Sequence, residues 1–398
     1  MREGSPARGL LFLSACSGAP PGGAETRAMP EIFHTVLAFL LVLTVVVFVH
    51  ELGHFLVARW NGVRVEVFSI GMGPELLGYT DRHGTRWRLS LLPVGGYVRF
   101  FGDADESSGS AEVDLEAMTP EEKAVCFHHK RVGQRAAIVA AGPLANFAFA
   151  ILVFAGLFMI HGQTRSVPVI DAVLAGSAAE AAGLKVGDRI VALNGKTVER
   201  FQDVQRRVAL SDGKVMQVGL VRDGQPLRVE VQPRFVDNDD GLGNTVKMAQ
   251  LGIQIKLSPG DVHRLGPVQA LEQGVAQTWT LSADTLTYVG QMISGFRSAS
   301  ELGGPIRIAL FSGQAAERGV ADLIVFIALL SANLGLINLF PIPMLDGGHL
   351  MFYTIEALRG RPLTERIQEM GLKVGLALVV ALMLFATWND LGLKGLWG

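Results

Sequence analysis

Long apolar segments constrain what this sequence can fold into more than any other feature. Four of them approach or exceed the roughly 20 residues that an α-helix needs to cross the hydrocarbon core of a bilayer. Hydrophobic residues make up 49% of the chain and charged residues only 18%, which is more apolar than is typical of a soluble protein. We therefore expect a polytopic α-helical membrane protein with four transmembrane helices, at residues 29–60, 135–161, 321–346 and 366–390.

A fifth apolar stretch lies between the second and third of these segments. Residues 275–296 include Gln, Ser and Thr side chains and the charged Asp284. This composition favours a helix that lies in the membrane interface over one that crosses the bilayer. We expect amphipathic helices over residues 262–320.

The positions of basic residues predict the orientation of the chain. Arg359, Arg361 and Arg366 lie between the third and fourth segments, and short loops rich in Lys and Arg stay in the cytoplasm. This orientation places residues 61–134 in the cytoplasm, and residues 161–322 and both termini outside. The net charge of −2 gives no electrostatic argument for a nucleic-acid partner.

The N-terminal 28 residues are rich in Gly, Pro and Ala. Within them, the Leu-Ser-Ala-Cys sequence at 13–16 is similar to a lipoprotein cleavage site, but the apolar run before it is short for a signal sequence. We expect residues 1–28 to be a disordered extension, or to precede a true start at Met29. With only Cys16 and Cys126, the chain has neither a disulfide framework nor a cysteine-based zinc site.

The first apolar segment contains the sequence HELGH, with two histidines four residues apart. On a helix, His50 and His54 share one face, so both imidazoles can bind one metal ion. Glu51 can then act as general base toward a water that the metal activates, and zinc suits this set of ligands. A chance match is a weak alternative, because ionisable groups in a spanning helix are costly. The motif predicts one zinc ion per chain.

A zinc site of this kind needs a third protein ligand. The best candidate segment is NLFPIPMLDGGHL at 338–350, where Pro341 and Pro343 interrupt an apolar run. Interrupted helices are tolerated at membrane depth where they face protein or a water-filled cavity. Asp346 is well placed there as a ligand, and His349 is a rival. Alternatively, Asp346 is a turn residue at the water interface.

HELGH together with the NxxPxPxLDGG pattern resembles the site-2 protease family of intramembrane zinc metalloproteases, and more closely its bacterial members of the regulator of sigma-E protease type. Segments 68–73, 91–100 and 133–151 are also similar to this family, so the resemblance covers most of residues 30–390. Met72 departs from the pattern, because many relatives carry Phe there.

The resemblance implies roles for individual residues. His50, His54 and Asp346 would be the zinc ligands and Glu51 the general base. Three further positions match residues that handle substrate near the metal in this family, namely Asn338, Pro341 and Pro343.

Two segments of the first loop have the composition of β-strands. They are residues 63–71 and 86–101, and the second is interrupted at Pro93 and at Gly95 and Gly96. In the family such strands form a re-entrant sheet beside the metal, where an edge strand could pair with an unwound substrate. Gly95 and Gly96 are therefore candidate substrate-binding residues. The alternative is a small cytoplasmic hairpin that only packs on the helices.

The region between the second and third segments resembles a PDZ domain, an α+β fold that we expect over residues 165–257. Asn194-Gly195 and Asp223-Gly224 are strong signals for tight turns between strands. Only one such domain is found, whereas the best-known enterobacterial relative has two. A peptide groove would include Leu251, Gly252 and Ile253. Alternatively, the domain binds no peptide and excludes bulky substrates.

These features predict a zinc-dependent endopeptidase of the inner membrane that cuts transmembrane segments of single-span proteins. By resemblance, its substrates would be anti-sigma factors or remnant signal peptides, first cut by a site-1 protease. Two alternatives are a membrane-anchored zinc protease that acts in quality control at the membrane surface, and a non-catalytic PDZ scaffold.

Overall fold

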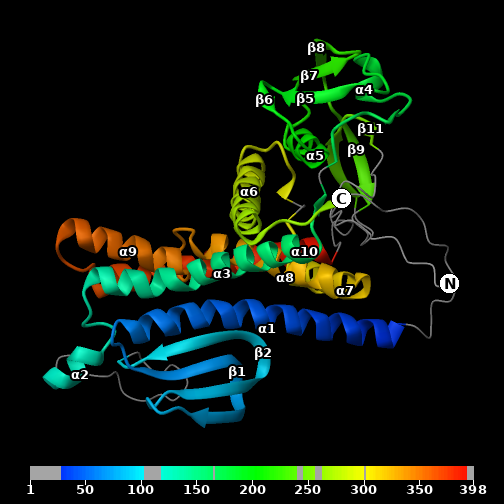
Figure 1. The fold of residues 1–398 in the computed structure, drawn as a ribbon. Helices are drawn as coiled ribbons and strands as arrows, with labels where there is room; N and C mark the ends of the chain where they lie inside the picture. The colour runs from blue at the N-terminus through cyan, green and yellow to red at the C-terminus, as the bar shows by residue number, and fades with distance from the viewer. Residues whose placement is uncertain are drawn as a thin grey trace. The chain divides into compact units, whose positions relative to one another are not determined.

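The computed structural model describes residues 28–102, 118–164, 166–239, 245–255, 262–299 and 302–391. Almost all of the predicted extension at 1–28, including Cys16, lies outside these residues. The chain forms two compact units (Figure 1). A helical unit is built from Gly23–Phe154, Leu271–Ser282 and Leu302–Gly398, and a β-rich unit mainly from Ala155–Ala270 and Ala283–Glu301.

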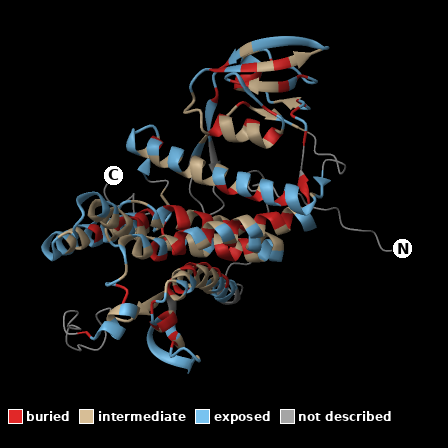
Figure 2. Cartoon of the chain, turned by 60° about the vertical axis from the view of Figure 1, so that its left-hand side comes forward, coloured by how far each residue is buried: buried red, intermediate tan, exposed pale blue. Residues whose placement is uncertain are grey.

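Among the residues that the structure describes, four helices are long and apolar enough to cross a membrane, as predicted. Their apolar side chains either pack against one another or remain exposed, and Figure 2 shows buried residues where the long helices pack together. In such helices the interior backbone N–H and C=O groups pair within the segment, which a bilayer requires. The four are α1 (Ala28–Trp60), α3 (Val132–Ile160), α8 (Val320–Asn338) and α10 (Glu365–Asp390).

The third helix is shorter than the predicted 321–346. Helix α8 ends at Asn338, and Asp346 is the first residue of a separate helix, α9 (Asp346–Arg359). The physical reason is the pair of prolines between them, Pro341 and Pro343, which have no N–H to donate to a preceding helical carbonyl. The LDGG segment therefore does not belong to the third apolar helix, and this part of the prediction is wrong.

The remaining helices are less apolar. Helix α6 (Pro267–Ile293) covers most of the predicted interfacial stretch and is not among the four spanning candidates in the described part of the chain. Two further helices are α2 (Pro120–Val125) and α7 (Pro305–Arg318). The start of α7 is fixed by Asp390 at the end of α10, whose carboxylate accepts from the backbone N–H groups of Gly304 and Arg307 at 2.9 and 3.0 Å.

Two long antiparallel strands, β1 (Val65–Thr80) and β2 (Arg86–Phe100), form a bent sheet in the helical unit. The first half of β1 pairs on both sides with β2, so that Phe68 lies opposite Trp87 on one side and Val98 on the other. The ring of Phe68 is fully buried, 4.4 Å from Trp87 and 5.4 Å from Phe55 of α1 between ring centroids. Aromatic packing therefore fixes this sheet against α1.

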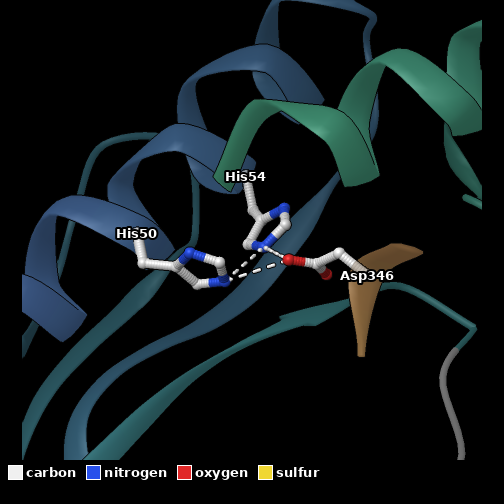
Figure 3. Close-up of side chains that lie close together, drawn as sticks. All are labelled: His50, His54 and Asp346. Atoms are coloured by element: carbon white, nitrogen blue, oxygen red, sulfur yellow. Dashed lines mark hydrogen bonds and ion pairs between the residues drawn. The ribbon is translucent and has the colours of Figure 1, made fainter. Parts of the chain in front are cut away.

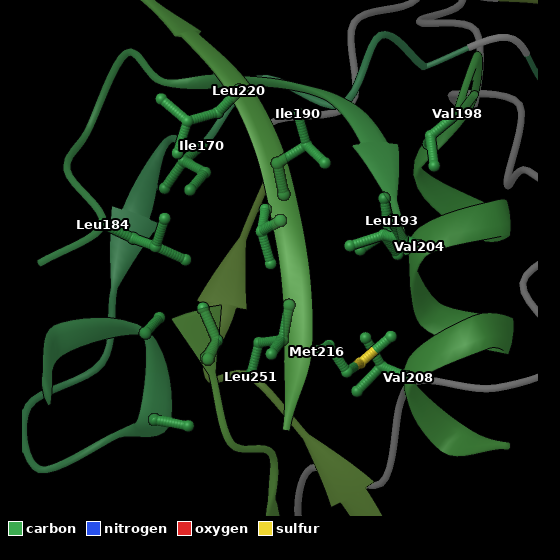
Figure 4. Close-up of a cluster of buried hydrophobic side chains, with 14 of the residues drawn as sticks. Ile170, Leu184, Ile190, Leu193, Val198, Val204, Val208, Met216, Leu220 and Leu251 are labelled. Carbon is green, nitrogen blue, oxygen red and sulfur yellow. The ribbon is translucent and has the colours of Figure 1, made fainter. Parts of the chain in front are cut away.

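The β-rich unit has a buried core of aliphatic side chains between a sheet and two short helices (Figure 4). Both predicted turns are present: Asn194 and Asp223 have φ of 50° and 48°, and each is followed by a glycine with positive φ. The four-stranded sheet has the order β6-β5-β7-β8, and β11 pairs with β4. The elements are β4 (Ala172–Val173), α4 (Ala178–Ala181), β5 (Arg189–Leu193), β6 (Lys196–Thr197), α5 (Phe201–Ala209), β7 (Met216–Arg222), β8 (Gln225–Val231), β9 (Arg234–Asp239), β10 (Thr245–Gln250) and β11 (Ile253–Gln254), with β3 (Gln163–Thr164) pairing with β12 (Val262–His263).

Candidate metal centre

Three predicted ligands converge in the helical unit (Figure 3). His50 and His54 extend from adjacent turns of α1, and Asp346 comes from the start of α9. The Oδ2 atom of Asp346 lies 3.1 Å from Nε2 of His50 and 3.5 Å from Nε2 of His54. The two Nε2 atoms are 3.2 Å apart. One ligand atom from each side chain therefore faces a common point.

The geometry fits a zinc ion. Tetrahedral ligands at zinc distances of about 2.0–2.1 Å lie roughly 3.3 Å from one another, close to the three separations observed. Within the described part of the chain, the buried Oδ2 atom of Asp346 has no hydrogen-bond partner other than the two imidazoles that it faces. Two imidazole nitrogens and one carboxylate oxygen leave a fourth position open, as in catalytic zinc sites.

His349, the rival ligand, does not belong to this cluster among the described residues. Its backbone N–H lies in the first turn of α9, and its ring stands edge-on to Phe352 with centroids 6.4 Å apart. The start of α9 therefore presents Asp346, not His349, to the two histidines of α1.

Helix α3 supports the site from a third direction. The Nδ1–H of His54 donates to the carbonyl of Ile138 at 2.9 Å, which leaves the lone pair of Nε2 free for a metal. Nδ1 of His50 lies 3.2 Å from the side chain of Asn146. Sequence analysis did not identify these α3 residues as functional, although the family-like segment 133–151 contains both.

Glycines allow α1 and α3 to approach this closely. A Cβ atom on Gly142 would collide with the imidazole of His54 and lie 2.9 Å from Cε1 of His50. A Cβ on Gly53 would collide with the Ala141 carbonyl of α3. Small residues at helix contacts are the usual way for membrane helices to pack closely. Only glycine therefore fits at position 142 without moving the histidine rings.

The glycines of LDGG have a similar role beside Asp346. A Cβ on Gly347 would collide with the carbonyls of Leu339 and Phe340, and one on Gly348 would lie 2.6 Å from Cα of Pro343. The first turn of α9 thus packs directly on the turn that precedes it. This packing fixes the position of Asp346 at the helix start.

Glu51 faces the sheet. A Cβ on Gly96 of β2 would lie 3.2 Å from Cγ of Glu51 and 2.9 Å from Cγ1 of Val47. The neighbouring Gly95 has φ of +85°, a conformation that favours glycine, and a Cβ there would lie 3.0 Å from Cε of Met72. The structure therefore brings the predicted strand interruption beside the proposed general base.

The other predicted substrate residues lie between α8 and α9. Nδ2 of Asn338, the last residue of α8, is 3.5 Å from Nε2 of His50. Pro341 and Pro343 belong to the turn that leads from it to Asp346. Asn338 thus lies beside the metal ligands, and the two prolines shape the segment that positions Asp346.

The predicted peptide groove belongs to the β-rich unit, not to the metal cluster. Leu251 is buried in the core of this unit, and Gly252 has φ of +77° and packs closely on Ser177. Ile253 begins β11, where it pairs with Val173. The carbonyls of Leu251 and Gly252 accept from the backbone N–H groups of Ala179 and Leu174, so this segment lies beside β4 and the start of α4.

Comparison with known proteins identifies the family. The sequence profile of peptidase family M50 matches residues 38–382. The chain belongs to peptidase family M50. It is 45% identical over 365 residues to a Rhizobium meliloti protein named "Putative zinc metalloprotease", covering 91% of this chain and 98% of the relative.

Two other relatives agree. An Agrobacterium fabrum protein of the same descriptive name is 46% identical over 358 residues, covering 89% of this chain and 95% of the relative. Metalloprotease MmpA of Caulobacter vibrioides is 38% identical over 379 residues, covering 89% of this chain and 95% of the relative. The M50 chain is thus a zinc metalloprotease, and the predicted resemblance and zinc cofactor are confirmed.

Proposed function

We propose that this protein is an intramembrane endopeptidase that cuts the transmembrane segments of single-span proteins. The observation that carries the proposal is the location of the zinc ligands. His50 and His54 lie within the 30-residue apolar stretch Glu31–Trp60 of α1, not in a domain beyond it. A protease that acted only at the membrane surface would not need its metal ligands inside such a helix.

The substrate has to be extended before it is cut, because a helix keeps its carbonyls hydrogen-bonded internally. Residues 96–98 of β2 pair with residues 68–70 of β1. Gly96 lies against Glu51. An unwound substrate strand that pairs with β2 would keep its backbone hydrogen-bonded next to the general base.

The chain's own residues would divide the chemistry between them. His50, His54 and Asp346 would hold zinc, which lowers the pKa of a bound water and polarises a carbonyl. Glu51 would accept the proton of the attacking water and donate it to the leaving amine. Asn338, beside His50, would orient the substrate near the metal.

The β-rich unit would act as a PDZ domain on the outer side of the inner membrane. The two tight turns, and the segment Leu251–Ile253 that pairs with β4, support this assignment. The domain would either bind the end of a substrate already shortened by another protease or exclude substrates that are still bulky. Arg359, Arg361 and Arg366 support a cytoplasmic location for the loop between α9 and α10.

The test uses purified protein in lipid vesicles with a single-span substrate, and mass spectrometry to locate the cut. We expect cleavage inside the apolar segment of the substrate, and none with the Glu51→Gln variant. Cleavage only outside that segment would instead support a protease that acts at the surface. Equal cleavage by Glu51→Gln would contradict the proposed catalytic role of Glu51.

The role of the β-rich unit needs its own test. Deletion of residues 165–255 should have a different effect on the cleavage rate of an intact substrate than on that of a pre-trimmed substrate. A size filter predicts that the deletion increases cleavage of the intact substrate. A peptide-binding domain predicts that it decreases cleavage of the pre-trimmed substrate.

A further inference from the structure

The side chain of Asn146 is fully buried beside the metal ligands on α3. Its Nδ2 atom lies 3.2 Å from Nδ1 of His50. Its Oδ1 atom is also buried, and it has no hydrogen-bond partner among the described residues. A buried polar atom without a partner is costly, so this arrangement calls for an explanation.

The ligand geometry determines which nitrogen of His50 carries the proton. Nε2 of His50 faces Nε2 of His54 and Oδ2 of Asp346, so Nε2 is the atom that would bind zinc. A neutral imidazole that binds a metal through Nε2 carries its proton on Nδ1. That N–H needs an acceptor, which an amide –NH₂ group cannot provide.

We infer that Asn146 is a positioning residue for His50, and that in the zinc-bound protein its Oδ1 accepts the Nδ1–H of His50. The two ends of an amide have nearly the same shape, so a half-turn of the side-chain amide exchanges them without other movement. The exchange pairs Oδ1 with the Nδ1–H of His50, and it moves the –NH₂ group to the buried position where Oδ1 has no hydrogen-bond partner among the described residues. The Nδ1–H of His50 then donates to an oxygen, as the Nδ1–H of His54 donates to the carbonyl of Ile138.

Helix α8 holds Asn146 in place. The hydroxyl of Ser331 donates to the backbone carbonyl of Asn146 at 3.1 Å, and both residues are fully buried. A Cβ on Gly335 would lie 3.3 Å from Cβ of Asn146, which shows how closely the two helices pack. The orientation of His50 therefore depends on the packing of α3 against α8.

This inference rests on the zinc site and not on where the substrate is cut. It is tested by zinc affinity, so a failed cleavage assay would not affect it. Asn146→Leu removes the acceptor while keeping the branching of the side chain. Asn146→Asp keeps an acceptor but removes the donor, so the two variants separate an acceptor role from a donor role.

The measurement is the zinc dissociation constant of the detergent-solubilised full-length protein, by competition with a chelator. We expect Asn146→Leu to weaken zinc binding about 10- to 100-fold, the range typical of a lost partner of a histidine ligand. Asn146→Asp should bind zinc within a few-fold of wild type. Gly156→Ala lies on the same helix at a position where an added Cβ would meet nothing within 4 Å, so it should also stay within a few-fold of wild type and serves as the control.

Two results would overturn the inference. One is wild-type zinc affinity in Asn146→Leu. The other is a loss in Asn146→Asp as large as in Asn146→Leu, because the aspartate still offers an acceptor. If Asn146→Leu does not fold, Asn146→Asp alone tests the inference. Retained zinc affinity in Asn146→Asp supports the acceptor role, and lost zinc affinity contradicts it.

Discussion

Oδ2 of Asp346 lies 3.1 Å from Nε2 of His50, although the two residues belong to helices far apart in the chain. The contact exists because α8 ends at Asn338 and the chain turns before α9 begins. In an uninterrupted helix, residues 338 and 346 would lie roughly 12 Å apart along the axis. Asn338 and the carboxylate of Asp346 could then not both lie beside His50. The break in the helix is therefore part of the metal site.

The choice between Asp346 and His349 as third ligand can be measured directly. Asp346→Asn should weaken zinc binding by more than about 100-fold, because it removes a ligand and not merely the partner of one. His349→Asn should leave the zinc affinity near that of wild type. Chelator competition on both purified variants gives the comparison, and a greater loss in His349→Asn would contradict the assignment.

Glu51 is expected to affect catalysis without affecting metal binding. Glu51→Gln should lower the rate of peptide cleavage by about 10²- to 10⁴-fold, the usual contribution of a general base, and keep one zinc per chain. Zinc content by elemental analysis and cleavage of a reconstituted substrate are measured on the same sample. Glu369→Gln is a suitable control, because the side chain of Glu369 is exposed and pairs only with Lys373 in the described contacts. Loss of zinc from Glu51→Gln would assign Glu51 to metal binding instead.

Gly142 tests how closely α3 has to approach the ligands. Gly142→Ala should displace the imidazole of His54, because the added Cβ would collide with it, and should lower both zinc affinity and activity about 10-fold or more. Gly156→Ala is the matched control on the same helix, since a Cβ there would meet nothing within 4 Å. The control should be neutral, or slightly stabilising because alanine favours helix. Equal behaviour of the two variants would show that the close approach at position 142 is unimportant.

The β-rich unit should lose stability in acid through Asp188. Both carboxylate oxygens of Asp188 accept from Arg222 at 2.7 Å, and these hydrogen bonds hold the pKa of the buried carboxyl below its ordinary value. A carboxyl group with a lowered pKa in the folded state stabilises the fold above its ordinary pKa of about 3.9. That contribution is lost as the pH falls through the folded-state value.

Arg222→Gln should therefore cost about 1–3 kcal/mol at neutral pH, between the values for exposed and buried ion pairs. The stability of the variant should also depend less on pH as the pH falls below the ordinary aspartate pKa of about 3.9. Hydrogen exchange of residues 166–231 in the full-length protein, corrected for intrinsic rates, reports both effects. Lys214→Gln, which removes an exposed partner of Asp212, should change neither the stability at neutral pH nor its dependence on pH. An unchanged acid dependence in Arg222→Gln would exclude this ion pair as its cause.

The sequence by itself determined the features that depend on local periodicity and turn chemistry. The four apolar helices follow from segment length, and the shared face of His50 and His54 follows from the helical repeat. The turns at Asn194 and Asp223 follow from side chains that tolerate positive φ. Each of these depends on residues a few positions apart.

Only the tertiary structure decided which groups surround the zinc site. It placed Asp346 rather than His349 beside the histidines, ended α8 before the LDGG segment, and brought Ile138 and Asn146 to the outer nitrogens of the two rings. These contacts depend on how closely separate helices approach, and Gly142, Gly347 and Gly348 set that distance because they lack a Cβ. Helical periodicity indicates which residues share a face, but it does not give the distance or the partner that this face meets.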